Sequence, residues 1–216
     1  MLDATSFAMA QQDVRYYLNG MLLEMGNQYV RMVATDGHRL ALSSLVADQT
    51  IEAEKQVIVP RKGIIELGRL LSDTDDEVVI SIGENHIFSK IGNFKFTSKL
   101  IDGKFPDYNR VIPKGGDKIM IADRSSLKNM LSRASILSHE NIRGIQLHLT
   151  KNLLQVFANN PEHEQAEDCL EVGYDNEDLQ IGFNVSYLID AMNVISSENV
   201  KITMLNSNSS ALIESL

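Results

Sequence analysis

The sequence has 216 residues, of which 44% are hydrophobic and 23% charged, a composition typical of a folded chain long enough for two ordinary domains. Its formal net charge of −9 argues against a surface that is basic all over, the simplest footprint of a nucleic-acid-binding protein. No apolar run approaches the ~20 residues that a bilayer-spanning helix needs, and the N-terminus lacks the layout of a secretion signal. We therefore expect a cytosolic (cytoplasmic) protein that makes no membrane contact.

The first half of the sequence alternates helical and strand patterns. Residues 6–18 space apolar side chains for one helical face and predict an opening helix. Residues 21–24 and 29–34 alternate as strands joined by a hairpin turn. Further strands are predicted at 38–45 and 56–60, a second helix at 62–71, and three more strands at 78–83, 86–92 and 94–101.

The second half repeats the first at an offset of 124 residues, which aligns residues 19–36 with 143–160 and residues 57–71 with 181–195. Residues 125–137 form the predicted opening helix of the second repeat, with Ser125 or Ser126 as its N-cap. The repeat predicts an α+β fold, with antiparallel sheet on one side of each unit and a helix pair on the other. Residues 102–118, rich in Pro and Gly, are the predicted linker, and we expect domains at 1–112 and 113–216.

Between Lys151 and Lys201 the chain has no Lys or Arg, and eight carboxylates crowd the first half of that interval. This run is either a solvated acidic face or a docking surface for a basic partner. The single cysteine, Cys169, excludes an internal disulfide and has no neighbouring Cys or His that would suggest redox or metal chemistry. We expect Cys169 to be a small, partly buried hydrophobe.

The stretch "VATDGHRLAL" (33–42) concentrates polar chemistry between two apolar runs. Catalysis would need Ser43 or Ser44 oriented by His38 and Asp36, but no GxSxG motif occurs. A metal site would need a third ligand, and the other histidines are scattered. We predict no catalytic residue, no metal and no cofactor. A tight turn, with Asp36 bonding backbone amides and Gly37 supplying an unusual φ, suits these residues in any case.

Several segments in order, among them "SFAMAQQDVRYYLNGML", "VATDGHRLAL", "VIVPRKGIIEL", "FTSKLIDGKFPDYNRVIP" and "IGFNVSYLIDAMN", resemble the bacterial sliding-clamp family, the beta subunit of DNA polymerase III. The resemblance covers essentially all 216 residues and corresponds to the second and third of the family's three domains, without its C-terminal tail. It implies repeated clamp domains with sheets outside and helices on the inner face. Two full-length chains of the family form a homodimeric ring around duplex DNA, which tethers a polymerase without catalysing a reaction.

The resemblance also implies a groove between the two domains that binds short peptides from polymerases, the clamp loader and repair proteins. Its residues here are Leu18, Thr35, Gly37, His38, Arg39, Leu40, Pro106, Arg110, Val111, Asn184, Tyr187 and Ser210. Asn208 stands where the family carries an apolar residue, and the missing tail contributes pocket floor. We therefore expect weakened peptide binding by this chain.

DNA-facing positions implied by the resemblance are Gln12, Arg15, Tyr16, Tyr17, Arg61, Lys62, Lys128 and Arg133; the ring interface is implied near Ile136, Leu137, Glu162 and Glu164. Because the partner surface for that interface lies on the family's first domain, we expect this chain not to close a ring. The alternative function is a truncated peptide-binding interaction module that does not encircle DNA. A hydrolase is a third, weaker interpretation.

Overall fold

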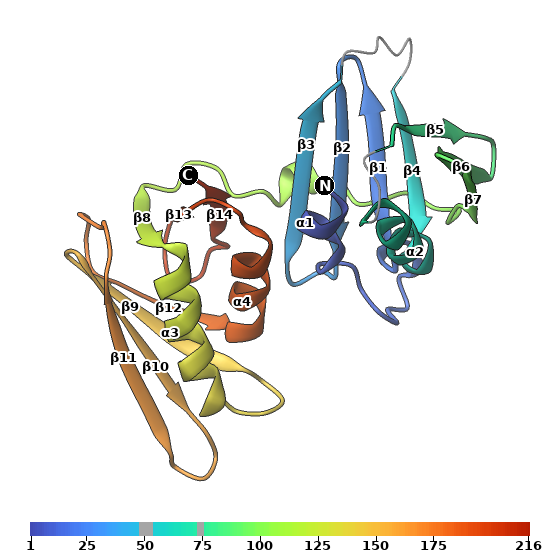
Figure 1. The fold of residues 1–216 in the computed structure, drawn as a ribbon. Coiled ribbons are helices and arrows are strands. Elements are labelled where there is room, and N and C mark those ends of the chain that lie inside the picture. Colours follow the sequence, from blue (N-terminus) through green and yellow to red (C-terminus); the bar gives the residue numbers. More distant parts are fainter. Residues whose placement is uncertain (48–53, 73–75) are drawn as a thin grey trace. The chain divides into compact units, whose positions relative to one another are not determined.

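The computed structural model describes residues 1–47, 54–72 and 76–216 and divides the chain into two compact units, Met1–Pro106 and Asp107–Leu216 (Figure 1). The division falls after Pro106, whereas the sequence suggested residue 112. Within the described ranges, no helix is long and apolar enough to cross a membrane.

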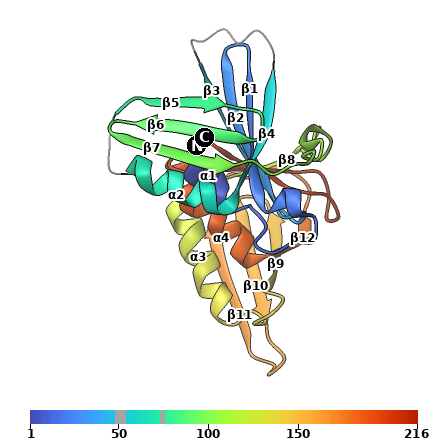
Figure 2. The same ribbon diagram turned by 90° about the vertical axis from the view of Figure 1, so that its right-hand side faces the viewer.

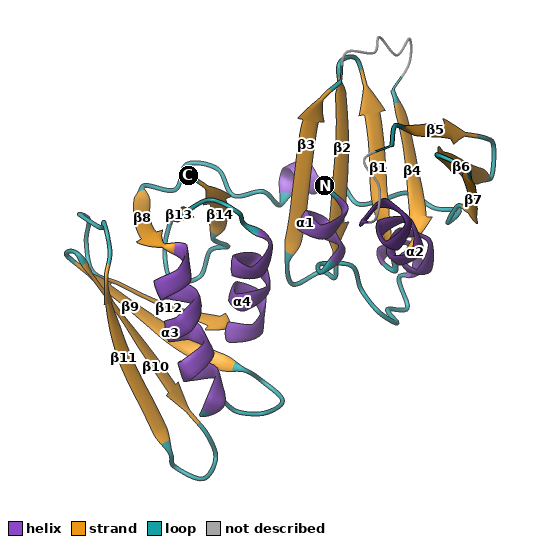
Figure 3. Cartoon of the chain, viewed as in Figure 1, coloured by secondary structure: helices purple, strands orange, loops and turns teal. Residues whose placement is uncertain are grey.

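The first unit combines a four-stranded antiparallel sheet, order β3-β2-β1-β4, with a three-stranded sheet, order β5-β6-β7. Helices α1 and α2 pack against the four-stranded sheet (Figures 1 and 3). The elements are α1 Leu2–Ser6, the 3₁₀ turn η1 Tyr16–Leu18, β1 Gly20–Gly26, β2 Tyr29–Thr35, β3 Leu40–Val46, β4 Lys55–Pro60, α2 Arg61–Ser72, β5 Val78–Ile82, β6 His86–Ile91 and β7 Phe94–Lys99.

The second unit has the same plan, with a four-stranded sheet of order β11-β10-β9-β12 and a three-stranded sheet of order β14-β13-β8. Its elements are the 3₁₀ turn η2 Tyr108–Arg110, β8 Lys118–Asp123, α3 Arg124–Ile136, β9 Gly144–Thr150, β10 Leu153–Asn159, β11 Gln165–Glu171, β12 Leu179–Asn184, α4 Val185–Val194, β13 Asn199–Met204 and β14 Leu212–Ser215. Strands β1 and β9 begin 124 residues apart, as do β2 and β10. The internal repeat and the α+β fold are confirmed.

Each unit has its own apolar core between sheet and helices. In the first unit Met21 and Leu23 of β1 meet Ile64 and Leu67 of α2. In the second unit, residues of α3 and α4 pack over alternate positions of β9, β10 and β12. The period-two alternation of the strands is visible in β10, whose burial alternates from Leu153 to Asn159. The helices therefore cover one face of each four-stranded sheet.

The predicted opening helix over residues 6–18 is wrong. Helix α1 ends at Ser6, and only the short turn η1 follows before β1. The Asp13 N–H donates to Asn19 Oδ1 at 2.8 Å, and Asn19 Nδ2 donates back to the Asp13 carbonyl at 2.8 Å. These side-chain bonds satisfy backbone groups outside a helix. Val14, one of the apolar residues at helical spacing in this stretch, is 95% exposed.

Two smaller expectations in the second unit are also wrong. The N-cap of α3 is Asp123 and neither serine, because Asp123 Oδ1 accepts the Ser126 N–H at 2.7 Å. Hydrogen bonds from the Ser126 side chain and backbone lower the pKa of the Asp123 carboxyl. Cys169 is exposed and not partly buried, since its side chain lies on the outward face of the edge strand β11.

Candidate functional site

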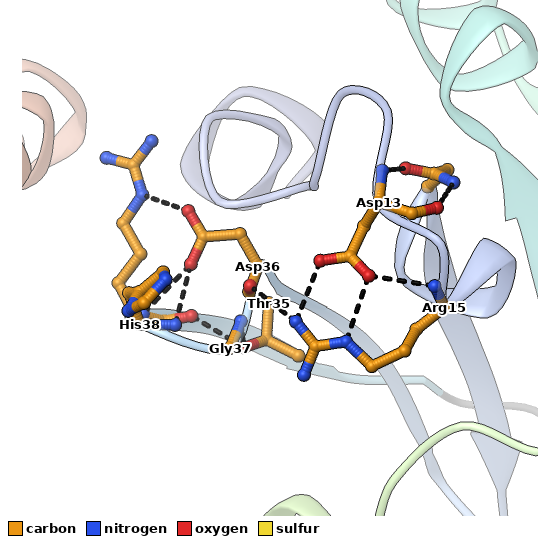
Figure 4. Close-up of polar contacts among 8 residues, drawn as sticks. Asp13, Arg15, Thr35, Asp36, Gly37 and His38 are labelled. Carbon is orange, nitrogen blue, oxygen red and sulfur yellow. Dashed lines mark hydrogen bonds and ion pairs between the residues drawn. The ribbon is translucent and has the colours of Figure 1, made fainter.

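The turn between β2 and β3 is built by hydrogen bonds from its own residues (Figure 4). Asp36 Oδ1 accepts the backbone N–H groups of His38 and Arg39 at 2.9 and 3.1 Å, which is the Asx-type turn expected of Asp36. Thr35 Oγ1 donates to the Arg39 carbonyl at 2.6 Å and accepts the Gly37 N–H at 3.1 Å. Gly37 has φ +91°, a conformation that favours glycine. The turn therefore holds the exposed His38 side chain on a rigid backbone.

The Arg39 side chain makes its hydrogen bonds within the first unit. Its Nε donates to Asp36 Oδ2 at 3.1 Å, and its Nη2 donates to the Phe7 carbonyl at 2.9 Å. The guanidinium carbon also lies over the Phe7 ring, 5.3 Å from its centroid, a cation–π contact. Arg39 thus fastens the residue after α1 to the turn, and its hydrogen-bonding groups are largely engaged inside the unit.

Residues Asp13 and Arg15 form a second ordered segment beside the turn. Arg15 donates Nη2 to Asp13 Oδ2 at 2.7 Å and Nε to Asp13 Oδ1 at 2.9 Å, a bidentate pair. Arg15 Nη2 also donates to the Asp36 carbonyl at 3.3 Å. A Cβ on Gly37 would lie 2.9 Å from the same Nη2. Figure 4 shows the Arg15 side chain extending from its own loop to the Asp36–Gly37 turn.

A hollow of about 340 Å³ lies in the first unit among these groups. Its lining includes Gln12 and Asp13 from one side and Asp36, His38 and Arg39 from the other. The structure thus brings a residue of the expected DNA-facing set, Gln12, next to the expected peptide-binding turn. The Asp13–Arg15 pair was not predicted from the sequence, although an Asp two residues before an Arg in a non-helical stretch is compatible with it.

The Asp13–Arg15 contact gives a pH prediction. Hydrogen bonds from the Arg15 side chain and backbone lower the pKa of Asp13 from 3.8 to about 2. Because the folded pKa lies below its ordinary value, the contact stabilises this loop above pH 3.8 and that contribution is lost as the pH falls through about 2. In Arg15→Ala, a carboxyl NMR titration should find the Asp13 midpoint raised towards 3.8 but still below it, because the backbone N–H of residue 15 continues to donate to Asp13 Oδ1. The Asp123 midpoint, set by Ser126, should not move.

The remaining expected peptide-binding residues lie on several elements of the two units. Leu18 is buried at the end of η1 and Pro106 is exposed. Arg110 pairs with Asp107 at 2.9 Å, and Val111 follows it exposed. Asn184 caps α4 by accepting the Ser186 N–H at 2.9 Å, and Tyr187 is half-buried one turn into that helix. Ser210 lies exposed before β14. Asn208, which stands where the family carries an apolar residue, is exposed there too.

The expected DNA-facing residues are only partly on helices. Gln12 and Arg15 lie in the loop before η1, and Tyr16 and Tyr17 lie in η1 itself, with their rings edge-to-face at 5.9 Å. Arg61 donates Nη1 to the Met9 carbonyl at 3.2 Å, so it supports that loop. Lys62 is exposed on α2, and Lys128 is half-buried on α3.

Arg133 and the expected ring-interface residues lie at the far end of α3 and on the β10–β11 hairpin. Arg133 pairs with Asp168 of β11 at 2.7 Å. Ile136 is exposed at the last turn of α3, and Leu137 caps it half-buried. Glu162 is exposed, whereas Glu164 Oε2 accepts Asn160 Nδ2 at 2.7 Å.

Both units match known domains. Residues 1–107 match the family described as DNA polymerase III beta subunit, central domain, and residues 109–216 match its C-terminal domain. The chain belongs to the DNA polymerase III beta subunit family. The recognition drawn from the sequence is thereby confirmed, together with the sheet-and-helix architecture of that family.

Curated relatives agree with this assignment. The beta sliding clamp of Pseudomonas aeruginosa is 57% identical over 213 residues, which are 99% of this chain and 58% of the relative. The beta sliding clamp of Escherichia coli K12 is 50% identical over 214 residues, again 99% of this chain and 58% of the relative. This chain therefore spans less than two thirds of the length of the beta subunits that it matches.

Solved structures of beta subunits share the fold. A crystal structure of the DNA polymerase III subunit beta from Pseudomonas aeruginosa has a TM-score of 0.97 at 57% identity and covers 99% of this chain and 58% of that one. A sliding clamp from the same organism bound to griselimycin also has a TM-score of 0.97, at 56% identity, covering 100% of this chain and 58% of that one.

Proposed function

We propose that the chain forms part of a replication processivity factor, a sliding clamp that tethers DNA polymerase to duplex DNA and catalyses no reaction itself. The observation that carries the proposal is the fold match to a clamp, with a TM-score of 0.97 over 99% of the chain at 57% identity. A tether raises the local concentration of the polymerase at its template without any new contact to the substrate. We place this activity in the cytoplasm.

The charge of the chain supports sliding. Affinity for phosphates grows with the number of cations that contact them, and tight contacts would hold a clamp at one position. The chain carries a net charge of −9, while α2 presents the exposed Lys62 at its start. Arg15 and Arg61 are already engaged by Asp13 and by the Met9 carbonyl. Lys62 is therefore the best single candidate for a sliding contact with phosphate.

We propose that partner peptides bind the residues implied by the family resemblance, with His38 as the principal polar contact of the first unit. His38 is exposed, and its backbone is fixed by Asp36, so its imidazole can bind a ligand without a cost in ordering the turn. Arg39 acts by holding the turn and so positions His38. Apolar anchors of a peptide would bury against Leu40 and Val111, which are partly accessible.

A chimaeric clamp tests the tethering function. These 216 residues would replace the matching segment of the Pseudomonas aeruginosa clamp, and primer extension on a primed single-stranded circle would be measured with the cognate polymerase and loader. We expect long products from single binding events, as with the parent clamp. A folded, ring-forming chimaera that supports only distributive synthesis would contradict the proposal.

Griselimycin, found bound to a clamp 56% identical to this chain, is a suitable probe of the peptide site. In calorimetry on the 216-residue chain, His38→Ala should weaken griselimycin binding about tenfold, as loss of a contact of about 1.4 kcal/mol would. His86→Ala removes an exposed histidine from another sheet of the same unit and should leave the affinity unchanged. Equal affinities for all three proteins would remove His38 from the site.

A further inference from the structure

The three-stranded sheet of the first unit has one buried and one exposed face. On β6, Ile87, Ser89 and Ile91 are buried and face the core. The alternate residues point outward, and their cross-strand neighbours on β7 share that face. Figure 2 looks onto this sheet, with β5, β6 and β7 side by side. We call the outward residues of the two strands the β6–β7 face: His86, Phe88, Lys90, Lys95, Thr97 and Lys99.

The β6–β7 face is basic in an acidic protein. Strands β5, β6 and β7 contain no Asp or Glu, although the chain carries a net charge of −9. Lys90, Lys95 and Lys99 are all exposed, and none of them makes an ion pair with another residue in the described part of the chain. The nearest acidic residues in sequence, Glu77 and Glu84, lie outside the strands. An exposed lysine cluster of this kind attracts an anion.

The positions of Lys90 and Lys95 lower the stability of the sheet. Lys90 lies directly opposite Lys95 in the antiparallel register, and like charges in directly opposite positions destabilise a sheet. The three-stranded sheet of the second unit contains a balanced cross-strand pair instead. Lys201 of β13 lies opposite Glu214 of β14, and the two form an ion pair at 3.0 Å. Lys90 and Lys95 have no such countercharge opposite them.

An exposed aromatic side chain lies among these charges. Phe88 is 46% exposed on the outward face, opposite Thr97, and the His86 ring lies 6.2 Å from its centroid with an interplanar angle of 33°. Rings on an open sheet offer a stacking surface for unpaired bases, while flanking lysines follow a phosphate backbone. Along β7, Lys95 and Lys99 stand about 13 Å apart at ~3.3 Å per residue. A duplex offers phosphates but not base faces.

We propose that the β6–β7 face binds single-stranded nucleic acid, with Phe88 stacking on a base and Lys90, Lys95 and Lys99 contacting phosphates. This site lies on β6 and β7, whereas the residues of the proposed clamp function lie on other elements. An acidic protein would satisfy the lysines but would leave the exposed aromatic pair unused.

Fluorescence anisotropy with the 216-residue chain and labelled oligo(dT) of about 16 nucleotides tests the site. Replacing the three lysines with Gln should weaken binding about tenfold or more and reduce the slope of log K against log[salt] by about 2. Phe88→Ala should weaken binding about tenfold. A control triple, Lys104→Gln, Lys114→Gln and Lys151→Gln, changes the net charge equally at exposed positions elsewhere and should retain binding.

Lys90→Glu separates a binding role from a structural one. This change recreates the Lys–Glu arrangement of the second unit opposite Lys95, so Tm should rise by about 1–3 °C while oligo(dT) binding weakens. Oligo(rU) in place of oligo(dT) distinguishes RNA from DNA as the preferred single strand. The proposal is overturned if the control triple loses as much affinity as the β6–β7 triple. It is equally overturned if polyglutamate displaces oligo(dT) as well as unlabelled oligo(dT) does and Phe88→Ala binds normally.

Discussion

Replacing Arg31 with Met is expected to lower the free energy of unfolding of the first unit by about 3 kcal/mol. Glu24 on β1 is only 4% exposed. Its Oε1 accepts Arg31 Nη1 from β2 at 2.9 Å, and its Oε2 accepts Gln56 Nε2 from β4 at 2.9 Å. Without Arg31, a buried carboxylate keeps its desolvation cost and loses its countercharge, which is why breaking such a pair is expensive.

Urea denaturation followed by circular dichroism measures this effect. Arg69→Met is the matched control, since Arg69 pairs with Glu66 at the same 2.9 Å but on an exposed surface, where ion pairs contribute at most about 1 kcal/mol. The double variant Glu24→Met with Arg31→Met should recover most of the lost stability, because an apolar pair removes the buried charge itself. Equal losses for Arg31→Met and Arg69→Met would show that burial does not set the cost.

The regular part of the fold follows from patterns that the sequence displays. Alternation of apolar residues placed β1 and β2, and apolar spacing at helical period placed α2 and α3, because burial on one face of each element dominates their energetics. The internal repeat was recognisable for the same reason: its aligned residues occupy equivalent positions, and Gly20 and Gly144 begin equivalent strands. These features depend on neighbours in sequence, which a pattern can show.

The misjudged parts depend on individual polar side chains. Residues 6–18 carry apolar residues at helical spacing, yet Asp13 and Asn19 exchange hydrogen bonds across six positions and hold the chain in a loop. Asp123 is the N-cap of α3, where the sequence predicted Ser125 or Ser126, since Asp and Ser can both cap a helix and the backbone position decides between them. The spacing of apolar residues predicts which positions are buried, but it does not show which side chain makes a local hydrogen bond.

In the candidate site too, the local features were predicted and the long-range contacts were not. The Asp36 turn and the positive φ of Gly37 were expected from composition alone, and both are present. The engagement of Arg39 with Phe7 and of Arg15 with the Asp36 carbonyl was not expected, because both contacts join segments more than twenty residues apart. As a result, His38 is the exposed member of the turn, whereas Arg39 is largely committed to structure. The assignment of these residues to peptide binding stays a prediction.

Replacing Leu154 with Ala is expected to lower the free energy of unfolding of the second unit by about 3 kcal/mol and to leave the first unit unaffected. Leu154 is fully buried near the start of β10, in a core cluster whose members all lie in the second unit. Removing its side chain loses transfer free energy and leaves a cavity that the flanking strands cannot close. Hydrogen exchange should quicken in β9, β10 and β12 and stay constant in β1, β2 and β4.

The neighbouring residue and the repeat supply the controls. Leu153 is half-buried on the opposite face of β10, and Val30 is the half-buried residue at the position of the first unit equivalent to Leu154. Because each exposes part of its side chain in the native state, Leu153→Ala and Val30→Ala should each cost about 1 kcal/mol, in proportion to the smaller apolar area lost. Faster exchange in both units of Leu154→Ala would mean that the two cores unfold as one, against the separation of their clusters.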